Sequence, residues 1–198
     1  MKLNNEFKEI KNDEYIKKID GSGLDKITNE FFSLINEANQ LRLQSNIANM
    51  DQVVVSTNEK PVIGTQALDT CFGILFYSRK NKFGICGHAD PNNISYIVIE
   101  MLKQIPLNME IEIEYVVVPG YRAIEQKNFK AIDEIRSLLD SYTSIYPKIN
   151  FVPLKTSINP VMPNGLLCYD FAFDTRTGLD ITDIVFRNTI VEQNSRHL

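Results

Sequence analysis

Apolar residues recur every three or four positions over residues 1–50, first as a thin stripe up to Ile19 and then as a fuller stripe from Leu24 to Leu41. That spacing is typical of amphipathic helices. The triplet Gly21-Ser22-Gly23 separates the two stripes as a turn, since it lacks the Lys and Ser/Thr of a phosphate-binding loop. We therefore expect a helical N-terminal extension over residues 1–50 and a second region over residues 51–198.

From Gln52 the pattern changes to short β-branched and aromatic runs separated by turn residues, which indicates a sheet. We expect strands at 53–55, 62–63, 72–77, 83–85, 110–118, 149–154, 166–173 and 181–187, with 174–178 as the last hairpin turn. One helix starts at Asp90-Pro91-Asn92 and ends at Pro106, and a second spans 128–145. Helices first, then mostly antiparallel strands with two inserted helices, predict a layered α+β fold.

Three glutamates, Glu110, Glu112 and Glu114, alternate with apolar residues along one expected strand. Side chains at a spacing of two share one face of a strand. Like charges close together repel each other unless water screens them. We therefore expect this face to be solvated, rather than to hold a metal or an acid–base pair.

Composition narrows the classes of function. A chain of 198 residues with 43% hydrophobic and 23% charged residues suits one well-packed core, and no apolar run approaches the length of a membrane-spanning helix. The net charge of −4, without a block of Lys or Arg, argues against binding of nucleic acid or insertion into a membrane. Three cysteines without a CxxC spacing indicate a reducing compartment. The first residues do not resemble a signal peptide, so we expect a cytoplasmic protein and leave open an export route that needs no signal.

Only one histidine of this chain is a candidate for a catalytic site. Of the two histidines, His197 is the second-last residue, so we expect only His88 in a built site. If Ser78 pairs with Phe83 across the turn 79–82, Gly73 lies opposite His88. Cys71 and His88 then become diagonal neighbours on one face, with Cβ atoms about 7 Å apart.

That geometry suits a Cys-His pair, in which an imidazole takes the proton of a thiol and later protonates the leaving group. The missing side chain of Gly73 is expected to leave room for the imidazole to lean toward Cys71. A buried, unreactive Cys71 and a merely hydrogen-bonded His88 remain open from spacing alone. A zinc set of Cys71, Cys86 and His88 is another reading, although it offers only three ligands. We expect Cys168 to be a buried core thiol without a role.

The run Thr65-Gln66-Ala67-Leu68-Asp69-Thr70-Cys71, followed by His88, resembles the active-site region of the chemoreceptor glutamine deamidase (CheD) family. That family carries a Thr six residues before a catalytic Cys and a His seventeen residues after it, and this chain has both spacings. The run Phe173-Asp174-Thr175-Arg176-Thr177-Gly178 is similar to the closing hairpin of the same proteins. The cytotoxic necrotizing factors share the constellation, and the resemblance covers about residues 60–187.

The resemblance implies a layered αββα sandwich and the hydrolysis of a protein glutamine to glutamate. Cys71 would be the nucleophile, His88 the base and then the acid, and Thr65 the group that orients His88, with Asp90 as the alternative for that role. Backbone N–H groups near Thr70 and Cys71 would stabilise the oxyanion. The implied partner is a chemoreceptor or another protein with a reactive glutamine, and the chemistry requires no cofactor.

Asp69 departs from the family, which usually has Gly at this position. The departure bears on the tight turn before the nucleophile and adds a charge that raises the pKa of the thiol. Two other functions remain open: a catalytically silent protein-binding module, and a Cys-His transglutaminase or protease. Both keep the hairpin and differ in the chemistry at Cys71.

Overall fold

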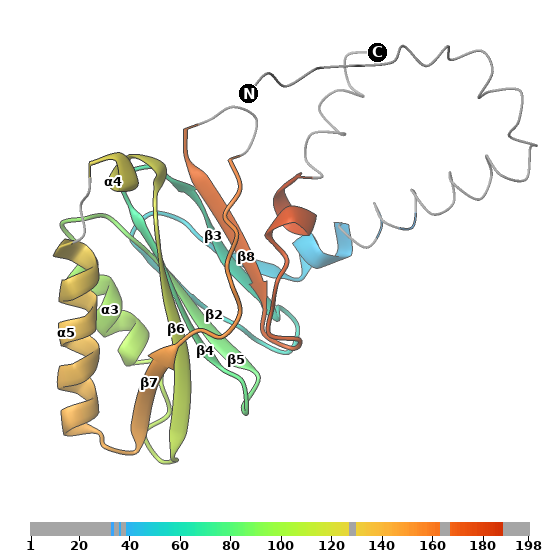
Figure 1. Ribbon diagram of the computed structural model, residues 1–198. Helices are drawn as coiled ribbons and strands as arrows, with labels where there is room; N and C mark the ends of the chain where they lie inside the picture. Colours follow the sequence, from blue (N-terminus) through green and yellow to red (C-terminus); the bar gives the residue numbers. More distant parts are fainter. Residues whose placement is uncertain (1–32, 34–35, 37–38, 127–129, 163–166, 188–198) are drawn as a thin grey trace, which may run out of the picture. The chain divides into compact units, whose positions relative to one another are not determined.

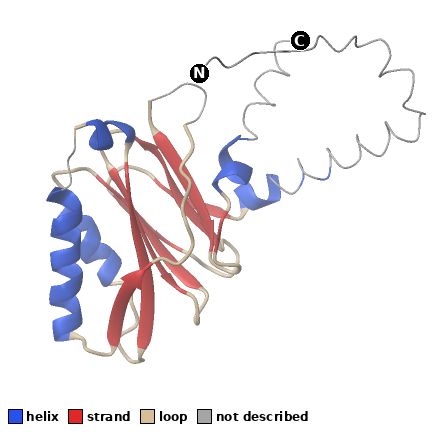
Figure 2. Cartoon of the chain, viewed as in Figure 1, coloured by secondary structure: helices blue, strands red, loops and turns tan. Residues whose placement is uncertain are grey.

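The computed structural model describes residues 33, 36, 39–126, 130–162 and 167–187. The chain divides into two compact units, residues 1–37 and 38–198, and the fold is that of the second unit. This unit contains two β-sheets (Figures 1 and 2). The four-stranded sheet has the order β1 (Ser45–Ala48), β3 (Val62–Leu68), β8 (Tyr169–Asp174) and β9 (Leu179–Asp180). The five-stranded sheet has the order β2 (Gln52–Val55), β5 (Phe83–Ala89), β4 (Phe72–Ser78), β6 (Ile111–Pro119) and β7 (Ile149–Pro153).

The β4–β5 hairpin lies inside the five-stranded sheet, and both of its faces are buried. Ser78 pairs with Phe83 and Gly73 pairs with His88, which confirms the register that the sequence predicts. Such a strand reads as a nearly continuous apolar run, as Phe72–Ser78 does, because neither face meets water. One face packs against helices, and the other packs against the four-stranded sheet.

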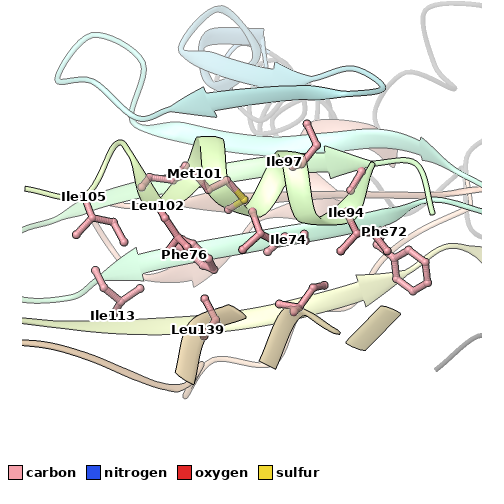
Figure 3. Close-up of a cluster of buried hydrophobic side chains, with 14 of the residues drawn as sticks. Phe72, Ile74, Phe76, Ile94, Ile97, Met101, Leu102, Ile105, Ile113 and Leu139 are labelled. Carbon is pink, nitrogen blue, oxygen red and sulfur yellow. The ribbon is translucent and has the colours of Figure 1, made fainter. Parts of the chain in front are cut away.

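Two helices, α3 (Ile94–Leu102) and α5 (Lys130–Ile145), cover the outer face of the five-stranded sheet (Figure 1). Ile94, Ile97 and Met101 recur at spacings of three and four on α3, so they share the face that meets the sheet. They lie over Phe72, Ile74 and Phe76 of β4 (Figure 3). Each such side chain removed from water contributes about 1.5–3 kcal/mol. The start expected for the second helix, residues 128–129, lies outside the described residues.

The two sheets meet through an apolar layer that includes Leu75, Cys86 and Phe171. Gly73 makes this contact possible, because a Cβ there would lie 2.4 Å from Cε1 of Phe171 and 2.9 Å from Cγ2 of Thr65. The space in front of Gly73 is therefore filled by the opposite sheet. The expectation that it leaves room for the imidazole to lean is wrong.

The outer face of the four-stranded sheet is covered more thinly. Val62 and Ala172 contact Val185 of the helical turn η2 (Asp183–Arg187), together with Leu41 from the helical residues 39–43. The layers thus follow the order helix, sheet, sheet, helix, and most strand pairs are antiparallel. The predicted layered α+β fold is confirmed.

Two expected elements take a different secondary structure, and the short helix Tyr121–Glu125 and strand β9 were not expected. Helix was expected up to residue 50, but Ser45–Ala48 forms strand β1, which pairs in parallel with β3; residues 1–32 of that expectation lie outside the described residues. The strand expected at 181–187 is also wrong, because Asp183–Arg187 is helical. Asp180 accepts a hydrogen bond from the N–H of Thr182 (3.0 Å), as a helix N-cap does. A short apolar run fits helix and strand equally well by its pattern alone.

The acidic strand also differs from expectation, because Glu114 is 1% exposed although Glu110 and Glu112 are exposed. Arg79 binds its carboxylate through Nε (2.7 Å) and Nη2 (3.0 Å), and the N–H of Lys155 donates to the same group (3.0 Å). These contacts hold the pKa of Glu114 below its ordinary value. A paired carboxylate tolerates burial that an isolated one does not.

Candidate active site

Cys71 and His88 lie at one end of the β4–β5 hairpin. Cys71 directly precedes β4, His88 is opposite Gly73, and the two residues are 3% and 2% exposed. The N–H of Gly120 donates to the carbonyl of Cys71 (2.8 Å), so the thiol lies at the end of the sandwich that carries the short helix α4 (Tyr121–Glu125) (Figure 1). The hairpin register makes Cys71 and His88 diagonal neighbours, as predicted.

The hydroxyl of Thr65 fixes both the orientation and the tautomer of His88. Thr65 belongs to β3, in the other sheet, and its Oγ1 lies 2.8 Å from Nδ1 of His88 and 3.0 Å from the carbonyl oxygen of Ala48. A hydroxyl donates one proton, and a carbonyl can only accept. Thr65 therefore donates to Ala48, and Nδ1 of His88 carries a proton that it donates to Thr65. In the neutral imidazole, Nε2 is then unprotonated.

Nε2 of His88 is buried and has no hydrogen-bond partner within the described residues, so no hydrogen bond joins it to Cys71 in this conformation. Leaving a buried polar atom unpaired costs about 1–3 kcal/mol. An orphaned atom of this kind in a native structure calls for an explanation, such as a catalytic role or a missing partner. An unprotonated nitrogen one diagonal step from a thiol is available to accept a proton.

Burial keeps both groups neutral at rest. Desolvation raises the pKa of the Cys71 thiol; a hydrogen bond with Thr70 lowers it, and the carboxylates of Asp90, Asp51 and Asp69 raise it further. Desolvation lowers the pKa of His88, although the nearby Asp51 carboxylate raises it. The resting pair is therefore a thiol and a neutral imidazole, and proton transfer has to accompany the attack of sulfur on a substrate.

Asp69 supports the loop that precedes the thiol. Its backbone does not take a positive φ, so the turn needs no glycine. Its carbonyl accepts the N–H groups of Arg122 (2.9 Å) and Ala123 (3.2 Å), which anchors α4. Its Oδ1 lies 3.4 Å from Nε of Arg122, which is an ion pair rather than a hydrogen bond. The turn before Cys71 therefore forms with Asp69 in place, and the charge of Asp69 raises the pKa of the Cys71 thiol as expected.

Asp90 has a structural partner of its own. Its Oδ1 accepts hydrogen bonds from the N–H and from Nδ2 of Asn92, both at 2.9 Å, at the start of the segment that leads into α3. The side chain that contacts Nδ1 of His88 is Thr65. Of the two orienting groups considered from the sequence, the geometry thus favours Thr65.

Sequence reasoning missed Asp51, which lies in the turn between β1 and β2 with a φ of 58°. Its N–H donates to the carbonyl of His88 (2.8 Å), and its carboxylate accepts from the N–H of Asp90 (3.2 Å) and from Nδ2 of Asn93 (2.9 Å). Aspartate tolerates a left-handed conformation better than most residues. The polar residues Asn49 and Asp51 just before the β-branched run Val53-Val54-Val55 were the available signal for such a turn.

A second missed feature is the β-bulge between Thr65 and Leu68 in β3. Ala67 has a φ of 59°, and its N–H donates to Oδ1 of Asp170 (2.6 Å). Asp170 is itself buried, and desolvation raises its pKa. This carboxylate holds the strained residue that connects the Thr65 strand to the loop carrying Cys71.

The described residues contain no group of three or more His, Cys, Asp or Glu side chains placed to hold a metal ion. Cys86, which completed the alternative zinc set, is fully buried between the sheets, and burial raises its pKa far above the ordinary value. Cys168 is half-buried rather than a core thiol.

A comparison with protein-family models matches no family, and a comparison with curated proteins finds no similar sequence. Within the described part of the chain, no helix is long and apolar enough to cross a bilayer.

Proposed function

We propose that this protein is a cysteine-dependent amidohydrolase that converts a glutamine of a target protein to glutamate, acting in the cytoplasm. The observation that carries the proposal is the Thr65 hydroxyl, which is committed to the Ala48 carbonyl and therefore leaves Nε2 of His88 unprotonated. A general base needs this form of the imidazole. The spacing of Thr65, Cys71 and His88 supports glutamine as the substrate through the resemblance to glutamine deamidases.

The first half of the reaction forms a thioester. Sγ of Cys71 attacks the side-chain amide carbon of glutamine while Nε2 of His88 takes the thiol proton. The imidazolium then gives that proton to the amide nitrogen, the C–N bond breaks and ammonia leaves. Thr65 keeps Nδ1 protonated throughout, so the imidazole does not turn away from the thiol.

The second half consumes water. Nε2 of His88 takes a proton from the water as its oxygen attacks the thioester carbon, and the C–S bond breaks. The proton returns to sulfur, and the product is glutamate. The protein is left unchanged, and the target gains one negative charge.

The loop before β4 supplies candidate oxyanion donors. Among the described residues, the N–H groups of Thr70 and Cys71 donate no hydrogen bond to a backbone carbonyl. Free N–H groups close to the nucleophile suit the stabilisation of a tetrahedral intermediate. We therefore propose these two N–H groups as the oxyanion donors.

The first test measures ammonia release from a library of glutamine-containing peptides, with Cys71→Ser and His88→Ala as matched variants. Wild type should release ammonia, the peptide mass should rise by about one dalton in ordinary water and by about three in ¹⁸O water, and both variants should lose at least about a hundredfold in rate. Activity retained in Cys71→Ser contradicts the assignment.

The same products separate the alternatives. A peptide joined to an added amine points to a transglutaminase, and a cleaved backbone points to a protease. The silent binding module is indicated if no peptide is turned over and if the alkylation rate of the Cys71 thiol is the same in wild type and in His88→Ala. Three observations favour this last reading: the raised pKa of the Cys71 thiol, its burial, and the lack of a hydrogen bond between it and Nε2 of His88 within the described residues.

A further inference from the structure

A groove of about 310 Å³ runs between strand β2 and helix α3. It exists because β2 is the edge strand of the sheet, whereas α3 packs on β4 and β5 (Figure 3). Val53 and Val55 line one wall. The other wall is one face of α3, where Tyr96 and Glu100 lie four positions apart, and Gln104 continues it in the turn that follows the helix.

The groove lies on the outer face of the five-stranded sheet, whereas Cys71 packs on the inner face. Asp51, at one end of the groove, connects it to the candidate active site. Asp51 lines the groove, and its N–H donates to the carbonyl of His88 (2.8 Å). Its carboxylate also lies close enough to Cys71 and His88 to interact with both electrostatically. Tyr96 is on the first turn of α3, at this end, and Gln104 marks the far end.

The lining favours a cationic side chain. Two of its residues, Asp51 and Glu100, are acidic, and none is basic. Lys103 pairs with Glu100, but the Asp51 carboxylate bonds only to amide N–H groups within the described residues. The valine wall suits the methylene stem of Lys or Arg. Tyr96 is 59% exposed, and an aromatic ring can bind a cation on its face.

We propose that this groove binds a Lys or Arg side chain of the polypeptide segment that carries the target glutamine. The inference rests on the proposed function, since it places the glutamine at Cys71. Tyr96 and Gln104 lie eight positions apart, which corresponds to about 12 Å at the helical rise of 1.5 Å per residue. An extended chain covers that length in about four residues. A bound segment therefore spans the groove with about four residues, and the proposed position of the basic side chain is beside Asp51, at the end next to the site.

The test uses ¹⁵N-labelled Cys71→Ser protein, which cannot form the thioester. Three peptides are titrated: acetyl-Gly-Gln-Gly-Lys-Gly-amide and the same peptide with norleucine or Glu in place of Lys. Amide signals of Val53, Tyr96 and Glu100 should shift saturably with the Lys peptide. Its Kd should be about two- to fivefold lower than that of the norleucine peptide, which is the scale of an exposed ion pair, and added salt should reduce the difference.

Three variants locate the effect. Asp51→Asn should abolish the advantage of the Lys peptide, whereas Asp140→Asn, an exposed carboxylate on α5, should preserve it. Gln104→Lys adds a positive charge at an exposed position and should weaken binding without affecting the fold. Equal shifts with the Lys and Glu peptides, shifts outside the groove, or no saturable shifts would overturn the proposal.

Failure here is distinguishable from failure of the proposed function. If the peptides bind in the groove but the wild type does not deamidate them, the peptide-binding site is supported and the proposed enzymatic function is refuted. If the rate of deamidation depends neither on Asp51→Asn nor on a basic residue near the glutamine, the enzymatic function is supported and the proposed role of the groove is refuted.

Discussion

At the scale of single residues, the candidate chemistry depends on the hydrogen bonds of one hydroxyl, that of Thr65. Thr65 has a carbonyl on one side and an imidazole on the other, and only one arrangement of protons satisfies both contacts. The same hydroxyl joins the two sheets, because Thr65 lies in the four-stranded sheet and His88 in the five-stranded one. A packing contact thereby decides which imidazole nitrogen is the base.

Replacing Thr65 by Val keeps the shape of the side chain and removes the hydroxyl. The Ala48 carbonyl and the Nδ1–H of His88 then lose their partner, so we expect a free energy of unfolding lower by about 1–3 kcal/mol. We also expect a mixture of imidazole tautomers, visible in the ¹⁵N shifts of labelled histidine, and a lower kcat. Thr65→Ser retains the hydroxyl and should retain the single tautomer. A single Nδ1–H tautomer in Thr65→Val would contradict this role of Thr65.

The sequence brings some of these residues together and misses others. Thr65, Cys71 and His88 lie close enough along the chain for a hairpin and a family spacing to connect them. Ala48 and Asp51 enter the site only because β1 pairs in parallel with β3 and then turns into β2. Such pairings depend on burial and on contacts between distant segments, which local patterns do not encode.

At the scale of elements, the accuracy of sequence reasoning follows the range of the contacts. The β4–β5 hairpin is local, and its register is pinned by alternation and by a four-residue turn, so it is predicted correctly. Strand β1 and the helical turn η2 are short segments that gain their structure from partners far along the chain. The burial of Glu114 has the same cause, since Arg79 lies 35 positions away.

The bulge in β3 provides a prediction at this scale. Asp170 is the acceptor for the N–H of Ala67, a residue with a positive φ. Asp170→Ala removes the acceptor, so we expect a free energy of unfolding lower by about 1–3 kcal/mol and faster hydrogen exchange in β3. Ala67→Gly relieves the left-handed conformation and should be neutral or stabilising by up to about 1 kcal/mol. Urea denaturation distinguishes the two, and a destabilised Ala67→Gly would count against strain at the bulge.

At the scale of the whole molecule, the layered fold places titratable groups where water cannot reach them. His88, Cys71 and Cys86 are all buried in or beside the layer between the sheets. Burial disfavours the charged form of each, so the imidazole resists protonation and the thiols resist ionisation. The folded protein therefore keeps these groups neutral over a wider range of pH than the unfolded chain does.

This difference predicts how stability depends on pH. As the pH falls through 6.5, the unfolded chain binds a proton at His88 that the folded chain does not bind, so the free energy of unfolding decreases on the acid side. As the pH rises through 9.0, the unfolded chain releases thiol protons that the folded chain retains at Cys71 and Cys86. The free energy of unfolding therefore decreases on the alkaline side as well. Each proton contributes a slope of at most about 1.4 kcal/mol per pH unit.

Urea denaturation between pH 5.5 and pH 10.5 should thus give a plateau between about 6.5 and 9 that falls away on both sides. His88→Gln removes the imidazole, so the slope near pH 6.5 should flatten while the alkaline slope stays. Cys86→Ala removes the fully buried thiol, so the alkaline slope should become shallower while the acid slope stays. An acid slope that survives His88→Gln would mean that another group titrates there, and the buried neutral imidazole on which the proposed mechanism depends would lose its support.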